Sequence, residues 1–252
     1  MQQVRHDHGA AATDPRVADL VRAGKVRVAL YLPQYTKDPA TGELRGWCVD
    51  LVRALGAHIG IAGVPVEHDT PPLAMASLKS GACDAGILGI DPSRTAMVDY
   101  SPPVVEADFT CLVPAGSSIR SVADADRPGT RIAVVRNHAS TLALSRILKH
   151  ASLVYADTVE PTFELIRRGE ADLFASLREM VVRFSVQLPG SRVLEERYGF
   201  NPLAMAVPKG ETGRCAYLSE FIEEAKSSGL VQQIIDRGGW RGIRVAPPGK
   251  SS

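Results

Sequence analysis

The chain of 252 residues has a formal net charge of +1, which argues against a main role in binding nucleic acid, because that role needs a basic face. With 45% hydrophobic and 23% charged residues, the composition is that of a globular protein, and the length suits one large domain or two domains of about 100–150 residues. No apolar run approaches the roughly 18 residues of a membrane-spanning helix.

The N-terminal region is predicted to begin with a tail over residues 1–13, which carries no apolar signal core. A short helix is expected next. Asp14 is suited to cap it, Pro15 to take its first position and Gly24 to end it.

From Val26 onward, apolar segments of strand length alternate with segments of helical periodicity. The strands lack a clean two-residue alternation, which is typical of parallel sheets that are covered on both faces. The pattern therefore predicts an α/β fold with largely parallel sheets. The expected strands are residues 26–30, 64–69, 83–90, 108–117, 131–137, 152–156, 171–176 and 201–210; the expected helices are 46–61, 72–81, 139–150, 159–170 and 178–188, with one or two more over 214–239 and a disordered tail over 246–252.

Part of this pattern occurs twice. Residues 46–89 and 140–176 each run helix, strand, helix and then a strand that begins with SGACDAGI or RGEADLFA. Two similar units suggest two similar lobes. The alternative is that the likeness only reflects βαβ units, which recur in any α/β protein.

The four cysteines are Cys48, Cys83, Cys111 and Cys215. None of them forms a CxxC pair, and no histidine and cysteine cluster has the spacing of zinc ligands. We expect thiols packed among apolar side chains, although one disulfide is possible and the sequence does not name its pair. No metal and no cofactor is expected.

The order and spacing of the successive motifs resemble the periplasmic solute-binding proteins of ABC importers, of the polar amino-acid-binding type (bacterial extracellular solute-binding protein family 3). The resemblance covers about Gly24 to Trp240. The matching stretches are GKVRVALYLPQY, GELRGWCVDLVRALGAHIG, LKSGACDAGILGIDPSRTAMVDYSPPV, TCLVPAGSSI, GTRIAVVRNHAST, LIRRGEADLFAS, AMAVPKG and FIEEAKSSGLVQQIIDRGGW.

This resemblance implies the type II periplasmic binding protein fold, in which two Rossmann-like α/β lobes are joined by two crossing strands and a ligand cleft lies between them. The lobes are expected to close on the ligand by a hinge motion. The expected limits are 25–112 plus 206–252 for lobe 1 and 113–205 for the inserted lobe 2, after a tail and short helix over 1–24; the crossings are expected near 111–116 and 204–209.

In lobe 1, the stretch GIDPSR corresponds to the place where the family holds the ligand carboxylate, so the resemblance assigns this role to Arg94. A guanidinium suits it because it binds a carboxylate through two parallel hydrogen bonds. The alternative is a surface arginine paired with Asp91 or Asp99. Gly89 and Asp91 also lie where the family contacts the ligand, although Asp91 replaces a threonine of the family and is suited to cap the next helix ahead of Pro92.

Aromatic side chains after the first strand form a wall against the ligand in this family. Tyr31 and Tyr35 are the candidates here, with packing against the neighbouring loop as the alternative for both. Trp47 is expected in the core rather than in the cleft.

In lobe 2, RNHAST corresponds to a helix start at which the family grips a carboxylate with backbone N–H groups and a hydroxyl. Ser140 and Thr141 are therefore candidate ligand contacts. His138 is either a further contact or a cap of that helix, and both readings stay open.

Many amino-acid binders of this family place an acidic residue after the strand that corresponds to residues 171–176. Here that place falls on Leu177, beside Ser176, which we keep as a candidate contact. A buried ammonium without a counter-charge is costly. Either the ligand lacks an α-amino group, or another acid replaces the missing one; the candidates are Glu179, Asp91 and Glu160.

The resulting expectation is a non-catalytic protein that captures a small carboxylate-bearing solute, an amino acid or a related organic acid, for an ABC permease. A monomer is expected, located in the periplasm if an export segment is missing from this sequence, and in the cytoplasm if this N-terminus is native. Two alternatives remain: an enzyme like cyclohexadienyl dehydratase with Glu179 or His138 as its general acid, or an orphan or sensory binding module.

Overall fold

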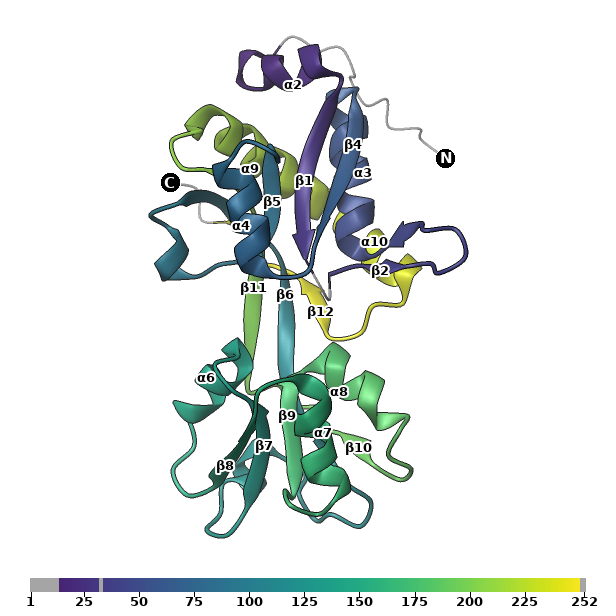
Figure 1. Ribbon diagram of the computed structural model, residues 1–252, viewed down its shortest axis with the longest axis vertical. Coiled ribbons are helices and arrows are strands. Elements are labelled where there is room, and N and C mark those ends of the chain that lie inside the picture. The colour runs from purple at the N-terminus through teal and green to yellow at the C-terminus, as the bar shows by residue number, and fades with distance from the viewer. Residues whose placement is uncertain (1–13, 32–33, 250–252) are drawn as a thin grey trace. The chain divides into compact units, whose positions relative to one another are not determined.

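The computed structural model describes residues 14–31 and 34–249, and these form two compact units, which Figure 1 shows with their elements labelled. Unit 1 comprises the described residues up to Val105, the segment Pro202–Gly239, and those from Val245 onward. Unit 2 comprises Glu106–Asn201 and Trp240–Arg244. The tail expected over residues 1–13 lies outside the described residues.

The chain passes from unit 1 to unit 2 inside strand β6 (Val98–Val113) and returns inside strand β11 (Gly199–Pro208). Each division point lies inside a single strand, so no boundary between a strand and a helix or loop marks it. Both divisions lie earlier along the chain than the limits expected from sequence, which were 112/113 and 205/206.

Unit 1 begins as the capping residues predict. The Asp14 carboxylate accepts a hydrogen bond from the backbone N–H of Arg16 at 2.9 Å and caps the 3-10 turn η1 (Pro15–Val17). Helix α2 (Ala18–Ala23) follows and ends at Gly24, whose φ of 68° favours glycine.

The sheet of unit 1 has the strand order β4, β1, β5, β11. Strand β1 is parallel to both of its neighbours, whereas β11 is antiparallel to β5. Every residue of β5 is buried, as expected for a strand covered on both faces. The remaining bounds are β1 (Lys25–Tyr31), β4 (Ala62–His68), β5 (Ala85–Gly89), α3 (Trp47–Ile59), α4 (Pro71–Lys79), α9 (Thr212–Ser227) and α10 (Leu230–Gly238).

Helix α3 and strand β4 approach each other through two glycines. A Cβ atom added at Gly56 would collide with the backbone nitrogen of Gly63, and one added at Gly63 would collide with the carbonyl oxygen of Val52. The helix and the strand are therefore packed backbone to backbone, a distance that only glycine permits.

Gly56→Ala is expected to destabilise the protein by about 1–3 kcal/mol, because the added methyl group forces two backbone segments apart. The matched control is Gly213→Ala in α9, where the added Cβ makes only an ordinary contact of 3.5 Å with the Arg16 side chain. That variant should be neutral or slightly stabilising, since alanine is the better helix former. Urea unfolding measures both, and equal midpoints for the two variants would contradict the close approach.

The sheet of unit 2 has the strand order β6, β9, β7, β8. Strand β7 is parallel to β8 and β9, and β9 is antiparallel to β6. The short strand β10 pairs with β6. The bounds are β7 (Arg131–Val135), β8 (Ser152–Ala156), β9 (Leu173–Leu177), β10 (Arg192–Val193), α5 (Val122–Ala125), α6 (Ala139–Ser145), α7 (Val159–Arg167) and α8 (Arg178–Ser185).

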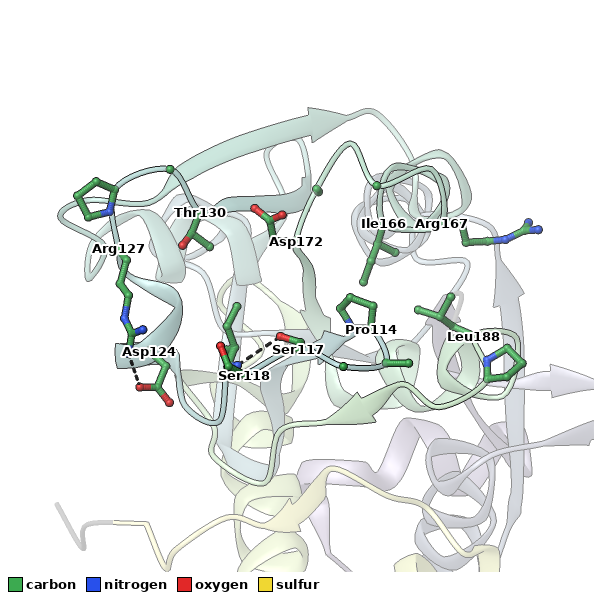
Figure 2. A pocket seen from close by; sticks show the side chains of 18 residues that line it. Pro114, Ser117, Ser118, Asp124, Arg127, Thr130, Ile166, Arg167, Asp172 and Leu188 are labelled. Atoms are coloured by element: carbon green, nitrogen blue, oxygen red, sulfur yellow. Dashed lines mark hydrogen bonds and ion pairs between the residues drawn. The ribbon is translucent and has the colours of Figure 1, made fainter.

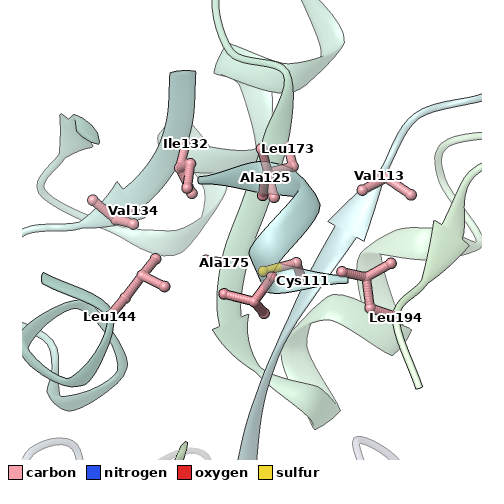
Figure 3. Close-up of a cluster of buried hydrophobic side chains, with 10 residues drawn as sticks. Cys111, Val113, Ala125, Ile132, Val134, Leu144, Leu173, Ala175 and Leu194 are labelled. Carbon is pink, nitrogen blue, oxygen red and sulfur yellow. The ribbon is translucent and has the colours of Figure 1, made fainter. Parts of the chain in front are cut away.

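Two hydrophobic clusters fill unit 2. One lies among β6, β7 and β9 and includes the Cys111 thiol, shown in Figure 3, where burial raises the pKa of that thiol to about 12. The other contains three aromatic rings, Phe163, Phe174 and Phe184, in tilted and edge-on contacts. These clusters account for the lack of alternation along the strands, because both faces of the sheet are buried.

The sequence repeat corresponds to an arginine–aspartate contact that occurs once within each unit. The Asp84 carboxylate accepts hydrogen bonds from the backbone N–H of Arg27 at 2.8 Å and from its guanidinium at 2.7 Å. Asp172 binds Arg131 in the same way, at 2.8 and 2.9 Å. In each unit the arginine also donates to the carbonyl of the glycine three residues before the aspartate. The repeated GxxD thus ties the start of one parallel strand to the start of the next.

Strand β6 and helix α6 differ from their expected lengths. Strand β6 begins ten residues before the expected position 108, although the prolines at 102 and 103 argue against a strand. The helix expected over 139–150 ends at Ser145, because the Asp126 carboxylate binds the backbone N–H groups of residues 149–151 and holds them outside the helix. The C-terminal helical region, expected to be one or two helices, is two helices divided at Gly229.

Other short elements were not expected from the sequence: the hairpin of β2 (Thr36–Lys37) and β3 (Leu44–Arg45), the turn of helix α5, the strand β10, and β12 (Ile243–Val245), which pairs with β6. Cys83, Cys111 and Cys215 have free thiols, while Cys48 is buried in α3. Within the described ranges, no helix is both long and apolar enough to cross a membrane.

Candidate functional site

The turn that carries Arg94 lies at the carboxyl end of the buried strand β5. Asp91 caps the 3-10 turn η2 (Pro92–Arg94), since its carboxylate accepts from the Ser93 backbone N–H at 2.8 Å and from the Ser93 hydroxyl at 2.7 Å. These hydrogen bonds and the nearby Arg94 lower the pKa of Asp91. The capping role proposed for Asp91 is therefore present, and it fixes the backbone from which Arg94 projects.

The Arg94 guanidinium is half-buried and donates a hydrogen bond to the carbonyl oxygen of Gly89 at 3.0 Å. The Tyr100 hydroxyl donates to the same oxygen at 3.1 Å. No carboxylate among the described residues lies within ion-pair distance of Arg94, because Asp91 binds Ser93 and Asp99 is paired with Lys209. The arginine is thus held in place by neutral groups, and its charge is not neutralised within the part of the chain that the structure describes.

Of the two tyrosines proposed to line the site, only Tyr31 lies close to Arg94. Burial raises the pKa of Tyr31, and the Arg94 charge and the Gly89 backbone oppose that rise. Tyr35 is 6% exposed, and its hydroxyl donates to the His68 carbonyl at 3.3 Å, as the packing alternative expects. Trp47 is buried in α3, in agreement with the core role.

Tyr100 was not identified from the sequence, because the strand that contains it was expected to begin only at residue 108. Burial raises its pKa, and a hydrogen bond and the charge of Arg94 act against this. The only available signal was its nearness in sequence to Arg94. That signal becomes meaningful once Val98–Val113 is known to be one strand running back from the turn.

In unit 2, His138 caps helix α6. Its Nδ1 lies 2.7 Å from the Ser140 hydroxyl and accepts from the Ser140 backbone N–H at 3.4 Å. Burial lowers the pKa of His138, which favours the neutral ring that this acceptor role requires. Among the residues that the structure describes, Asn137 is the non-glycine residue with a left-handed backbone, at a φ of 57°. It directly precedes the capping residue His138.

The other candidates of unit 2 are deeply buried. Ser140 is 1% exposed, and the Thr141 hydroxyl donates to the Val135 carbonyl at 2.7 Å. Ser176 lies on β9 opposite Thr110 of β6 and is also buried. These positions cluster where α6 packs against β9, at the carboxyl ends of the parallel strands β7 and β9.

The three acids considered as substitutes at Leu177 have different surroundings. Asp91 is committed to Ser93, and Glu160 is 65% exposed and lies 3.7 Å from Arg183. Glu179, in the first turn of α8, is half-buried and has no ion pair or hydrogen bond with any described residue. Burial raises its pKa, and the charge of Arg183 limits the rise.

This raised pKa has a consequence for stability. The folded state holds the Glu179 proton more tightly than the unfolded chain, whose carboxyl titrates near 4.5, so stability should fall as the pH rises through 4.5 toward the folded pKa. Glu179→Gln cannot titrate, and its free energy of unfolding should fall less steeply across that range. Urea unfolding between about pH 4 and about pH 8 tests this. Glu170→Gln, at an exposed position of the same unit, should keep the wild-type pH dependence, and an identical profile for both variants would refute the assignment.

A separate cavity of about 920 Å³ lies in unit 2 and is shown in Figure 2. Thr130 and Asp172, which precede β7 and β9, place it at the amino ends of these strands, whereas His138 and Ser176 lie at the carboxyl ends. None of the candidate residues lines it. Its charged side chains are neutralised locally: Arg127 by Asp124, Arg167 by Glu164, and Asp172 by Arg131.

Comparison with known proteins agrees with this fold. The ABC transporter glutamine-binding protein GlnH of Bacillus subtilis (strain 168) is 23% identical over 207 residues, which cover 79% of this chain and 74% of the relative. A protein from Wolinella succinogenes, solved in complex with lysine, is 25% identical with a TM-score of 0.69, covering 85% of this chain and 95% of the other.

A third similar protein is an ancestral amino acid-binding protein described as a precursor of cyclohexadienyl dehydratase, at 22% identity and a TM-score of 0.67, covering 88% and 98% of the two chains. These structures confirm the predicted type II periplasmic binding protein fold. The sequence profile of bacterial extracellular solute-binding proteins, family 3, matches residues 25–239, nearly the whole of the described chain. The protein therefore belongs to the bacterial extracellular solute-binding proteins of family 3.

Proposed function

We propose that this protein binds an amino acid through its carboxylate and α-ammonium groups and passes it to an ABC permease. The observation that carries the proposal is Arg94, a half-buried guanidinium without an acidic partner among the described residues, held by the Gly89 carbonyl at the end of β5. Such a group is suited to bind a carboxylate through two parallel hydrogen bonds. In this proposal Tyr100 positions Arg94 by sharing the Gly89 oxygen.

Glu179 is the group that we assign to the ligand ammonium. The chain has a leucine at position 177, where the resemblance places an acid, and an ammonium needs a counter-charge when it is withdrawn from water. Asp91 and Glu160 are each engaged by neighbours, which leaves Glu179 as the available carboxylate of the three. An ammonium beside it would favour the ionised carboxylate and lower its pKa again.

Thr141 contributes a hydroxyl oxygen rather than a proton in this scheme. The Ser140 hydroxyl lies against the His138 ring nitrogen, and the Thr141 hydroxyl proton is donated to a backbone carbonyl. A hydroxyl whose proton is committed can still accept a hydrogen bond through its oxygen. Thr141 therefore suits a cationic group better than a carboxylate.

The ABC importer role in this proposal is supported by the relatives, and the periplasmic location is proposed together with it. GlnH is an ABC transporter protein that binds glutamine, and the Wolinella protein was solved with lysine. We propose the same type of task here, with a monomeric binding protein presenting an amino acid to a permease.

The test is calorimetric titration of the purified chain with L-glutamine, L-lysine and L-arginine, and with 2-oxoglutarate as a carboxylate ligand without an amino group. Binding of an amino acid and not of 2-oxoglutarate supports the assigned pair of contacts. Binding of 2-oxoglutarate alone would overturn the role of Glu179 and favour an organic acid. No binding of any of these ligands would contradict the proposal.

A second candidate is a lyase like cyclohexadienyl dehydratase. The observation that favours it is Glu179, because a half-buried carboxyl group with a raised pKa is suited to donate a proton to a departing hydroxyl group. One structural neighbour is described as a precursor of such an enzyme. Incubation with prephenate decides between the two: turnover that Glu179→Gln abolishes establishes the lyase, whereas amino-acid binding without turnover removes it.

A further inference from the structure

The C-terminal segment Trp240–Arg244 belongs to unit 2, although the residues on both sides of it, Gly239 and Val245, belong to unit 1. The chain therefore passes between the units within β6, within β11 and twice more around this segment, which we call the strap. The resemblance implies two crossing strands, so the strap is an addition to the expected architecture.

The strap is hydrogen-bonded along β6. The backbone N–H of Asp108 donates to the Gly242 carbonyl at 2.8 Å, both in unit 2. Past the strap, the N–H of Ala246 donates to the Val104 carbonyl at 3.0 Å, both in unit 1. Strand β12 thus follows β6 through the point where β6 leaves one unit and enters the other, and its Ile243 side chain is buried.

A buried carboxylate fastens the strap on the unit 2 side. The Asp108 side chain is 3% exposed and accepts from the Arg244 guanidinium at 2.7 and 3.1 Å. Arg197 lies 3.2 Å from it, and Arg178 lies 3.6 Å from it. These arginines come from β12, from the loop before β11 and from the start of α8, so one carboxylate joins three segments of unit 2 to β6.

The fit of the strap against α8 is close as well. A Cβ atom added at Gly242 would collide with the side chain of Arg178, and the φ of Gly242 is 80°. The stem of Arg178 is held there because its guanidinium also donates to the carbonyls of Leu194 and Glu195, at 3.0 and 2.8 Å. Glycine at position 242 is thus required both for the turn and for the approach to Arg178.

We propose that the strap is a third link between the units and that it limits the movement of one unit with respect to the other. The ion pair between Asp108 and Arg244 holds the strap to β6, and we call this ion pair the latch. A chain joined by two strands can bend and twist at both strands, as hinge motion requires. A third strand paired with β6 at the crossing must bend with it or separate from it. The strap bends with β6 as long as the latch is intact, because Arg244 must leave Asp108 before the strap can separate from β6 on the unit 2 side.

Arg244→Gln tests the latch in the ligand-free protein, so that its outcome does not depend on the proposed function. Asp108 keeps Arg178 and Arg197 in this variant, and no buried charge is left without a partner. The matched control is Arg241→Gln, which removes the same charge from an exposed position of the strap without a hydrogen bond or ion pair to any described residue.

The first readout is hydrogen exchange of the amides of Asp108 and Ala246, which donate to Gly242 and Val104. Arg244→Gln should accelerate both by about threefold or more, because the opening free energy of the strap falls by the strength of a partly exposed ion pair. Arg241→Gln should leave both unchanged, as should the Asp172 amide of unit 2 in every variant. Equal rates in the two variants would overturn the latch.

The second readout tests the limited movement. Fluorophores on Lys79→Cys in unit 1 and Lys149→Cys in unit 2, in a Cys215→Ser background, report the distribution of distances between the units in single molecules. Both lysines are exposed. Arg244→Gln should broaden this distribution relative to Arg241→Gln. Faster exchange with an unchanged distribution would show that the strap is latched but does not limit movement, which overturns that part of the proposal.

Discussion

Arg94→Ala is expected to remove most of the affinity for the amino-acid ligand. Truncation leaves the ligand carboxylate without its charged partner, and loss of one member of a buried hydrogen-bonded pair costs about 2–5 kcal/mol. That corresponds to a rise in Kd of roughly 30-fold to several thousand-fold. The measurement is calorimetric titration with whichever amino acid the wild-type protein binds, supported by the ligand-induced rise in Tm.

The matched control is Arg22→Ala, which removes an exposed arginine of α2 in the same unit and should leave Kd unchanged. Tyr100→Phe adds a graded test, because it removes only the hydroxyl that shares the Gly89 oxygen with Arg94 and should weaken binding by a smaller factor. If Arg94→Ala keeps the wild-type Kd, Arg94 does not bind the carboxylate and the proposed site is wrong.

Phe174→Ala is expected to destabilise unit 2 by about 3–5 kcal/mol. The ring is completely buried on β9, with centroids 6.0 Å from Phe184 and 6.5 Å from Phe163. Its removal leaves a cavity among side chains of three elements, β9, α7 and α8, whose backbones are fixed by the sheet and by one another. A large part of the transfer free energy and of the packing contacts is lost together.

Urea unfolding followed by circular dichroism measures this change, with a fluorescence probe in each unit to detect separate transitions. The control is Val186→Ala, directly after α8, where a side chain that is 81% exposed should contribute less than about 0.5 kcal/mol. A midpoint for Phe174→Ala close to that of the control would mean that the aromatic cluster collapses to fill the cavity.

The regular elements were predictable because their signals are local. Asp14, Pro15 and Gly24 mark a helix by capping chemistry alone, and Gly60 ends α3 with a φ of 85°. The GxxD repeat was visible as letters, but its reason, a carboxylate that joins the starts of two parallel strands, appears only in the folded chain. The early part of β6 was missed because consecutive prolines oppose a strand locally, and pairing with other segments overrides that preference.

The sequence predicted where along the chain the candidate site residues lie, but not which hydrogen-bond and ion-pair partners their side chains have. The sequence places Arg94 after a buried strand, but the absence of a carboxylate beside it within the described residues depends on Asp99 binding Lys209, 110 residues away. Tyr35 was as good a candidate as Tyr31 until its hydroxyl was seen to bind His68. Among Glu179, Asp91 and Glu160, only the surroundings of each carboxylate distinguish the available acid from the engaged ones.

The sequence by itself determined the α/β class, the alternation of elements, the capped helix ends and the resemblance to solute-binding proteins, because each of these rests on residue order and local periodicity. Only the tertiary structure decided where the units divide, which charges are neutralised and that the C-terminal strap is fastened to Asp108. The physical reason is that electrostatic pairing and strand pairing join residues far apart in the chain. Asp108 and Arg244 are separated by 136 positions, and no local pattern marks either as the partner of the other.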